Sequence, residues 1–504
     1  MSRVRSVAIV GVTGRIVDVE VDHSQGLPGF CLVGLPDAAV SEARDRVRAA
    51  VLNSGLPWPA QRITVNLSPA DLQKRGSGFD LALACALLLV QRRIPESSLA
   101  GAVVLGELGL DGSVRSVPGV VPAVLAARDA GFNRVVVAAA SGGQAALVPD
   151  VSVLAVGDLK QLCAVLRGET PVPQLATAIA AAEPRVPDLS EVIGQAEARL
   201  ALEVAAAGGH HLYLHGPPGA GKTLLVSRLP GVLPELTVAE ALEVTAIHSV
   251  LGVLPPDAGL IRRPPFVSPH HSASVPAVIG GGSGLPRPGA VSLAHRGVLF
   301  LDEAPEFRAG VLDSLRQPLE SGELIVSRSA GSVRLPARFQ LALAANPCPC
   351  GRFGSSALAC ECSPLQVRRY ANRLSGPLLD RIDLRVGVRP LRPADLEQPA
   401  LAEGSSIVAA RVQAARQAAR ERWGQRWAVN AHVPGSALRS RWRPDPAAMT
   451  SVNREMDAGR LSARGVDRVL RVSWTLADLA GRPAPAASDL ATALRFRGAV
   501  GAAA

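Results

Sequence analysis

The feature that most constrains the fold of this 504-residue chain is a glycine-rich loop that directly follows an apolar run. Residues 216–223 read Gly-Pro-Pro-Gly-Ala-Gly-Lys-Thr, which fits the phosphate-binding pattern GxxxxGK[ST]. The run 212–215 reads as a buried strand, and an apolar helical pattern follows the loop. Strands and helices then alternate to about residue 390, the pattern of a parallel α/β sheet. The sequence therefore predicts a nucleotide-binding α/β domain in the middle of the chain.

The loop offers three kinds of contact to phosphate groups. Its glycines let backbone N–H groups approach oxygen atoms, and the helix that follows points its positive N-terminal end at them. We expect the Lys222 ammonium to neutralise the β- and γ-phosphates of ATP and the Thr223 hydroxyl to bind Mg²⁺. The predicted cofactor-binding residues of the loop are Gly216, Pro217, Pro218, Gly219, Ala220, Gly221, Lys222 and Thr223.

Two later strands end in polar side chains that suit the same chemistry. An apolar run ends at Asp302 and Glu303, and a further run, 339–345, ends at Asn346. Asp302 is expected to complete the Mg²⁺ shell, mostly through water, and Glu303 to orient or deprotonate the attacking water. The Asn346 amide either hydrogen-bonds that water or the γ-phosphate, or forms the turn before Pro347.

Two arginines stand further along the chain. Arg381 follows an apolar helical turn, and Arg464 opens a helical pattern in the C-terminal part. An arginine delivered to the γ-phosphate by a neighbouring subunit is a known device in phosphoryl transfer. Arg464 is a candidate to report the nucleotide state to a helical lid. A surface ion pair is the alternative for either arginine taken alone.

These motifs together resemble the AAA+ ATPases, and within them the magnesium-chelatase-like branch. The resemblance implies that Asn346 is sensor 1, Arg381 the arginine finger and Arg464 sensor 2. It also implies that the segment 188–195 packs on adenine, with Ile193 against the base. All four residues would then act on ATP.

The same resemblance divides the second half of the chain. It implies an AAA+ core at 188–395, with a parallel sheet, flanking helices and a helical lid domain at 396–504. The core contains a polar segment with His270 and His271, followed by a glycine-rich stretch, which looks like the helix 2 insert of this clade. A metal site at the histidines is one interpretation; a polar loop contact is the one we favour.

Residues 322–336 alternate on both sides of a Ser-Ala-Gly turn, which predicts a β-hairpin. In related helicases such hairpins line a central pore and touch DNA, and Arg328 and Arg334 are the basic residues available here. An ordinary surface hairpin is the alternative interpretation.

The first 167 residues read as an α+β domain, with a strand at 15–21 and helices at 37–54 and 79–90. This domain resembles the protease domain of Lon, built on a ribosomal-S5-like fold. The position of the nucleophilic serine falls on Gly78, and the position of the activating lysine falls on Val121. Without a group to activate a hydroxyl, amide hydrolysis lacks its general base. We expect no protease activity from this domain.

A proline-containing segment at 168–187 reads as a linker between the N-terminal domain and the AAA+ core. A Lon-like domain, a chelatase-like AAA+ module and a helical C-terminal domain in this order resemble the YifB/ComM family. That resemblance implies a hexameric ATP-hydrolysing motor on single-stranded or branched DNA, acting in branch migration. Three alternatives share the motor: a magnesium-chelatase subunit, a MoxR-like chaperone acting on proteins, and an ATP-dependent protease, the last opposed by the missing dyad.

The charge distribution bears on the partner. The net charge is +10, and residues 401–504 hold 16 Arg against 8 Asp and Glu. A basic terminal domain suggests nucleic acid, although a solvated arginine-rich face has the same composition. Four tryptophans lie in the same part, where they either stack on bases or pack the helices of the lid: Trp423, Trp427, Trp442 and Trp474.

Four of the seven cysteines lie close together, in a CxC-x9-CxC arrangement formed by Cys348, Cys350, Cys360 and Cys362. Four thiolates on a short loop suit tetrahedral Zn²⁺, but CxC is tighter than the usual spacing, so reduced thiols are an equal alternative. This usage of cysteine does not look like a secreted disulfide framework.

No apolar run approaches the length of a membrane span, and the N-terminus does not read as a signal peptide. We therefore expect a cytoplasmic protein.

Overall fold

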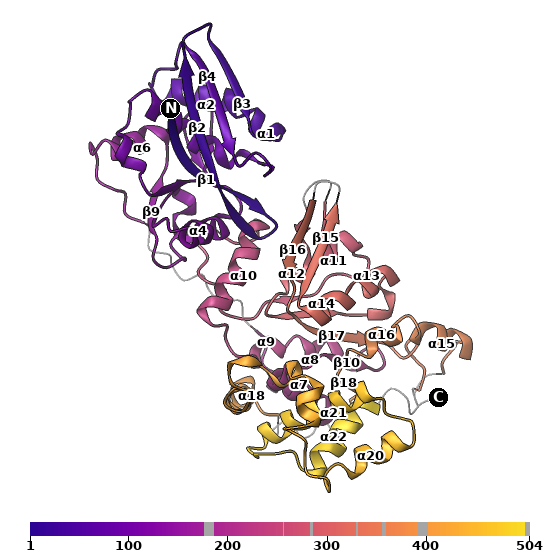
Figure 1. Ribbon diagram of the computed structural model, residues 1–504. Helices are drawn as coiled ribbons and strands as arrows, with labels where there is room; N and C mark the ends of the chain where they lie inside the picture. The colour runs from indigo at the N-terminus through magenta and orange to yellow at the C-terminus, as the bar shows by residue number, and fades with distance from the viewer. Residues whose placement is uncertain are drawn as a thin grey trace.

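The chain folds into three tiers that follow its order, with the N-terminal domain, the sheet that carries the glycine-rich loop, and a helical C-terminal domain stacked one after another (Figure 1). The computed structural model describes residues 1–175, 186–255, 257–282, 286–328, 331–354, 359–391 and 402–498. Half of the predicted linker, residues 176–185, and the apex of the predicted hairpin lie outside these residues. No helix within them is long and apolar enough to cross a membrane.

The N-terminal domain is built on one mixed seven-stranded sheet, in the order β3-β4-β2-β1-β5-β8-β9. The apolar helix α3 packs against β1 and β2 in the core of this domain. The strands are β1 (Ser2–Val10), β2 (Thr13–Ser24), β3 (Gly29–Val33), β4 (Arg62–Ser68), β5 (Ala102–Val104), β8 (Arg134–Ala138) and β9 (Ser152–Val156). The main helices are α1 (Ala38–Ser41), α2 (Ala43–Asn53), α3 (Asp80–Val90), α4 (Val120–Asp129) and α6 (Leu159–Leu166).

The predicted elements of this domain are present, with differences at their ends. The strand predicted at 15–21 lies within β2, and α3 with the short turn before it covers 79–90. The helix predicted at 37–54 is two helices, α1 and α2, with Glu42 as the capping residue between them. The mixed pattern of strands and helices agrees with the predicted α+β class.

The central tier is a five-stranded sheet in the order β11-β14-β17-β10-β18, and every pairing is parallel. Its strands are β11 (Phe266–Val267), β14 (Val298–Leu301), β17 (Gln340–Ala345), β10 (Leu212–His215) and β18 (Leu384–Gly387). The helices around it include α7 (Ala196–Gly208), α8 (Lys222–Val226), α10 (Val238–Val250), α12 (Ala290–Leu293), α13 (Ala309–Ser314), α14 (Arg316–Ser321) and α16 (Gly376–Leu379). This is the predicted mixed α/β fold with a parallel sheet.

Two small hairpins stand on this tier. The pair β15 (Glu323–Arg328) and β16 (Gly331–Pro336) is the predicted hairpin, and it points upward from the sheet in Figure 1. The pair β12 (Gly280–Gly281) and β13 (Arg287–Pro288) follows the short helix α11 (Val275–Ile279). A Cβ added to Gly280 would lie 3.3 Å from the side chain of Leu335, so the two hairpins are in contact.

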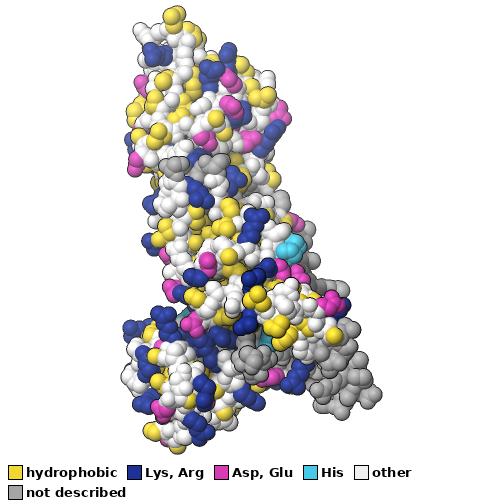
Figure 2. All heavy atoms as spheres, turned by 90° about the vertical axis from the view of Figure 1, so that its right-hand side faces the viewer, with side chains coloured by type: hydrophobic (Ala, Val, Ile, Leu, Met, Phe, Trp, Pro, Cys, Tyr) yellow, Lys and Arg dark blue, Asp and Glu magenta, His cyan; other side chains and the backbone are white. Residues whose placement is uncertain are grey.

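The third tier is helical and shares a core with the second. Helices α18 and α21 both pack on α7, and buried residues of all three belong to one apolar cluster. The helices are α18 (Ser405–Trp423), α19 (Gly435–Arg439), α20 (Thr450–Asp457), α21 (Ala463–Leu479) and α22 (Ala487–Gly498). Lys and Arg side chains are frequent at this end of the molecule (Figure 2).

The N-terminal domain is attached to the central tier through packed side chains. Helix α4 lies against α10, and the Gly119 N–H donates to the Ser249 carbonyl at 2.9 Å. The turn between β1 and β2 contacts strand β16 of the β15–β16 hairpin, since a Cβ on Gly11 would lie 2.3 Å from the side chain of Val333. Gly11 has a φ of +64°, so both its conformation and its surroundings require glycine.

Candidate nucleotide-binding site

The glycine-rich loop lies at the carboxyl end of β10, between β17 and β18. Gly219 and Gly221 have φ values of +75° and +90°, in the left-handed region that favours glycine. Gly221 caps the N-terminus of α8, so the helix begins at Lys222 with its free N–H groups facing the loop. The local structure is the predicted strand, glycine loop and helix, with the geometry that binds anions in other proteins.

Lys222 is buried inside the loop. Its Nζ donates to the carbonyls of Gly216 at 2.6 Å and Pro217 at 3.0 Å, and to Asn346 Oδ1 at 3.0 Å. Burial lowers the pKa of Lys222, and the nearby carboxylates of Asp302 and Glu303 act in the opposite direction. The end of β17 thus places the amide of Asn346 on the ammonium group, as expected of neighbouring parallel strands.

Thr223 and Asp302 form the oxygen pair expected to hold Mg²⁺. The Thr223 hydroxyl donates to Asp302 Oδ2 at 2.6 Å, across the gap between α8 and the end of β14. A hydroxyl and a carboxylate are hard oxygen donors, and both are open to solvent, so the donor set suits Mg²⁺ with water in its remaining positions.

Glu303 follows at the end of the same strand, with a φ of +50°. Its side chain is half exposed, and its Oε2 lies 3.3 Å from Nδ1 of His271. The His271 ring contacts the His270 ring at a tilt of 34°, with the ring centroids 4.1 Å apart. His270 Nδ1 lies 2.8 Å from Ser272 Oγ, which is a polar contact within the loop of the kind expected there.

The two predicted arginines lie apart from this cluster. Arg381 is paired with Glu320 of α14 and donates to the Pro377 carbonyl at 2.6 Å. Arg464 is exposed in the first turn of α21. Ile193 is half-buried in the segment before α7. Among the described residues, neither arginine forms a hydrogen bond or an ion pair with Lys222.

A buried ion pair that the sequence did not reveal joins the lid to the sheet. Asp383, at the start of β18, is 3% exposed and lies 2.5 Å from Nη1 of Arg468 on α21. It also contacts His210 Nδ1 at 3.2 Å. The opposite charge of Arg468 and the His210 hydrogen bond outweigh burial and hold the pKa of Asp383 far below its usual range. Arg468 also donates to the Arg381 carbonyl at 3.1 Å, so this pair fixes the backbone of the predicted finger.

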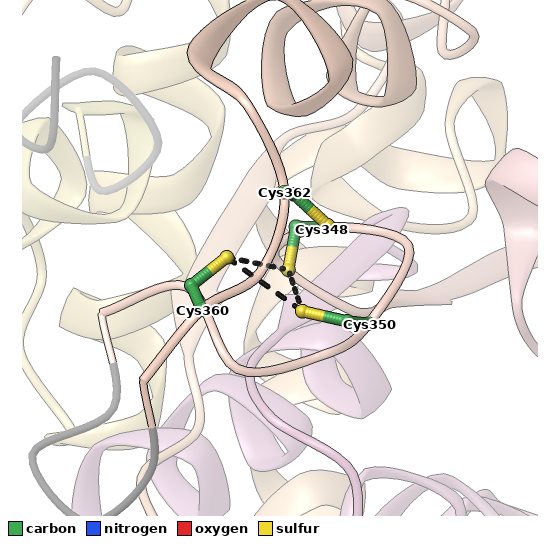
Figure 3. A group of neighbouring side chains, drawn as sticks. All are labelled: Cys348, Cys350, Cys360 and Cys362. Atoms are coloured by element: carbon green, nitrogen blue, oxygen red, sulfur yellow. Dashed lines mark hydrogen bonds between the residues drawn. The ribbon is translucent and has the colours of Figure 1, made fainter.

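The four clustered cysteines converge on one point beside the loop. All four sulfur atoms lie within 4.8 Å of one another, with Cys348 and Cys360 3.7 Å apart and Cys350 and Cys360 3.6 Å apart. Figure 3 shows these three sulfurs turned toward one another, with Cys362 beside them. Ideal tetrahedral Zn–S bonds give S···S separations of about 3.8 Å, so the donor set fits a metal ion. A Cβ on Gly351 would lie 2.5 Å from Pro218, so the cysteine loop touches the phosphate-binding loop.

The tryptophans of the lid pack against one another. Trp423 forms edge-on contacts with the other three rings, at centroid distances of 4.9 to 6.2 Å. Trp423 and Trp474 are buried, and Arg422 lies over the Trp474 ring while paired with Asp478. The base-stacking interpretation is therefore wrong for these two rings, because the helices of the lid already cover them.

Comparisons with known proteins bear on all three tiers. Three family models match the chain. The model described as magnesium chelatase, subunit ChlI, matches residues 188–396, and the model described as subunit ChlI of Mg-chelatase matches residues 19–141. The model of the ChlI C-terminal region matches residues 402–497. Competence protein ComM of Haemophilus influenzae is 42% identical over 98% of this chain and 97% of its own length.

The chain belongs to the magnesium-chelatase-like YifB/ComM family. Protein YifB of Escherichia coli is 41% identical over 95% of this chain and 93% of its own length. An uncharacterized protein of Mycobacterium tuberculosis is 53% identical over 99% of this chain and 98% of its own length. The family predicted from the motifs is thus confirmed, and with it an AAA+ module of the magnesium-chelatase type.

Proposed function

We propose that this protein is an ATPase whose active site is the cluster at the carboxyl edge of the central sheet. The observation that carries the proposal is the meeting of Lys222, Asn346, Thr223 and Asp302 at the ends of three neighbouring elements. Each supplies a group that phosphoryl transfer requires, and the buried ammonium group of Lys222 in a glycine loop suits an anionic phosphate ligand.

The residues divide the work of hydrolysis. Lys222 compensates the charge of the β- and γ-phosphates, and Asn346 orients the γ-phosphate or the attacking water. Mg²⁺, held by Thr223 and Asp302, supplies further charge compensation on the phosphate oxygens. Glu303 accepts the proton of the attacking water, and its half-exposed carboxylate has a free oxygen for that purpose.

The remaining predicted residues act around this centre. We place Ile193 against the adenine base and Arg464 as the lid's sensor of the nucleotide. We place Arg381 in the active site of the next subunit of a hexameric ring. The position of Arg381, away from Lys222 of its own chain and paired with Glu320, supports a role between subunits. The N-terminal domain is proposed to be inactive as a protease, since Ser77 is hydrogen-bonded to Glu107 and Val121 is buried.

For the substrate we propose single-stranded or branched DNA. Arg328 and Arg334 are exposed on the β15–β16 hairpin, where Arg334 pairs with Glu323 at 3.0 Å, and both would meet a phosphate backbone that approaches the hairpin. The relationship to a competence protein favours the same substrate. A protein-remodelling role is the second candidate, favoured by the 38 kDa magnesium-chelatase subunit of Rhodobacter capsulatus, 32% identical over 35% of this chain.

The four-cysteine cluster is proposed to bind Zn²⁺ and to brace the phosphate-binding loop. Two of its sulfur separations, 3.7 and 3.6 Å, are close to the tetrahedral value, the Cys348–Cys350 separation is shorter at 3.3 Å, and Gly351 packs on Pro218. The cluster follows Asn346 by two residues, so a fixed metal would also fix sensor 1.

The test is ATP turnover with and without DNA. We expect single-stranded or branched DNA to bind with ATP present, more weakly as salt rises, and to accelerate hydrolysis. Arg328→Ala with Arg334→Ala should reduce the acceleration and leave basal hydrolysis unchanged. If neither form of DNA binds at low salt, the DNA proposal fails and the protein-remodelling candidate takes its place.

A further inference from the structure

A cavity lies between the N-terminal domain and the central tier, where the β15–β16 hairpin begins and ends. One wall is the turn between β1 and β2 together with α4, and the facing wall is α10, the segment after α12 and the two ends of the hairpin. Helix α4 packs on α10 beside it (Figure 1), so the cavity belongs to a packed junction between two domains. Its volume is about 620 Å³, within the range of sites that hold a small molecule.

Arg338 lines this cavity from the segment between β16 and β17, and its position is fixed. Its N–H donates to His295 Nδ1 at 3.1 Å, and its carbonyl accepts from the Arg296 N–H. Its stem lies over Gly322, where an added Cβ would be 2.7 Å from Cγ of Arg338. Within the described part of the chain, however, the guanidinium group of Arg338 has no hydrogen bond and no ion pair.

Arg15 lines the same cavity from the N-terminal domain. It lies on β2 opposite Ala8 of β1, and its side chain is exposed. The preceding Gly14 is packed against α4, since an added Cβ would lie 2.6 Å from Cβ of Ala126. Among the described residues, the guanidinium group of Arg15 likewise has no hydrogen bond or ion pair. Two arginines from two domains therefore meet one cavity without carboxylate partners.

Three carboxylates also line the cavity, and each already has a partner of opposite charge. The pairs are Glu243 with Arg296, Glu323 with Arg334, and Asp129 with Arg128. The charges left over are those of Arg15 and Arg338, so the cavity has an excess of positive charge. Guanidinium groups form paired, charge-assisted hydrogen bonds with phosphate oxygens. The apolar side chains of Ile16, Leu125 and Pro336 in the same walls suit the uncharged part of a ligand.

We propose that this cavity is a phosphate-binding site in which Arg15 and Arg338 bind the phosphate oxygens of one ligand. The phosphate belongs either to a free phosphorylated small molecule or to the DNA proposed to contact the hairpin. Since the two arginines belong to different domains, the bound ligand holds the N-terminal domain against the central tier. The site lies outside the glycine-rich loop, and the inference goes beyond the proposed ATPase function.

The first experiment is calorimetric titration of the full chain carrying Lys222→Ala with inorganic pyrophosphate. This background removes the lysine of the glycine-rich loop, so the loop does not dominate binding. We expect pyrophosphate to bind, and Arg15→Gln or Arg338→Gln to weaken its binding at least tenfold, because each removes a charged fork. Arg338→Lys keeps the charge without the fork and should weaken binding by only about threefold. Arg15→Gln changes an exposed side chain, so the test does not depend on the Arg338 variants alone.

The second experiment distinguishes the two sources of phosphate. Binding of labelled single-stranded DNA is measured by fluorescence anisotropy with ATP present, in the chain with native Lys222. If the ligand is a DNA phosphate, Arg15→Gln with Arg338→Gln should weaken DNA binding at least tenfold and make it less sensitive to salt. If the ligand is a free phosphorylated molecule, DNA binding should stay within about twofold while pyrophosphate binding is lost.

The matched control is Arg62→Gln, which changes an exposed arginine of β4 in the same sheet and outside the cavity. It should leave both binding constants within about twofold. An equal loss in Arg62→Gln and in the cavity variants would overturn the inference, as would unchanged binding of both probes in the double variant. Failure of the proposed function looks different: the parent chain would not hydrolyse ATP, whatever binds in this cavity.

Discussion

Arg468→Ala should loosen the lid from the sheet. The substitution leaves the Asp383 carboxylate, which is 3% exposed, with the His210 hydrogen bond and without its direct guanidinium partner. Removing one partner of a buried ion pair costs about 3–5 kcal/mol, because the remaining charge stays out of water without compensation. Since about 1 kcal/mol shifts the melting temperature of a module of this size by 2–4 °C, we expect a fall of about 6–20 °C.

The assay is thermal unfolding of the full chain, followed by tryptophan fluorescence. Trp423 at the end of α18 and Trp474 on α21 are buried in the lid core, so their emission follows the transition of interest. The matched control is Arg460→Ala, which removes an exposed ion pair with Glu455 in the same domain and should leave the melting temperature unchanged.

A double variant tests the cause. Asp383→Asn with Arg468→Met removes both charges and fills similar space, so it should melt closer to the parent than Arg468→Ala does. If Arg468→Ala melts within about 2 °C of the parent, the buried pair does not hold the lid and the reasoning is refuted. The same result would remove the argument that Arg468 fixes the Arg381 backbone.

Three further predictions follow from the same geometry. Arg381→Ala subunits should bind ATP and hydrolyse it poorly, and mixing them with Glu303→Gln subunits should restore part of the activity. If no mixing ratio restores activity, Arg381 acts within its own subunit and not in the active site of the neighbouring one. Purified protein should contain one zinc ion per chain by atomic absorption, and Cys360→Ser with Cys362→Ser should lose it and weaken ATP binding by about tenfold, because Pro218 loses its support; an unchanged ATP affinity would contradict the bracing role. Burial lowers the pKa of His211 to about 4, and its Nδ1 accepts a hydrogen bond from the Leu341 N–H. The imidazole is therefore neutral in the folded state. In the unfolded chain it takes up a proton below about pH 6.5. Stability should therefore fall from about pH 6.5 toward pH 4, with a smaller loss in His211→Gln, and an equal loss in the variant would assign the effect to other groups.

The local elements and the edge of the sheet were predictable because each carries its own signal. The alternation at 15–21 and the apolar run at 339–345 specify strands, and both are present in the fold. Parallel strands bring their carboxyl ends to one edge, so Lys222, Asp302 and Asn346 were expected to meet, and they do. The roles assigned to these residues remain predictions.

The contacts between distant segments were not predictable in the same way. Asp383 and Arg468 are 85 residues apart, and nothing in either local pattern marks one as the partner of the other. The docking of Gly11 on Val333 likewise depends on how two domains pack, which periodicity does not encode. Asp383 does stand two residues after Arg381 in a segment marked by the family resemblance, and that proximity was the available signal.

The central claim is that the Lys222 loop hydrolyses ATP and that DNA drives it. The most direct measurement is phosphate release by the purified full chain, with and without single-stranded DNA, beside Lys222→Ala. The account predicts hydrolysis by the parent, faster with DNA, and none by Lys222→Ala, which lacks the charge that holds the phosphates. Equal phosphate release by the parent and Lys222→Ala, or none by the parent with or without DNA, would contradict it.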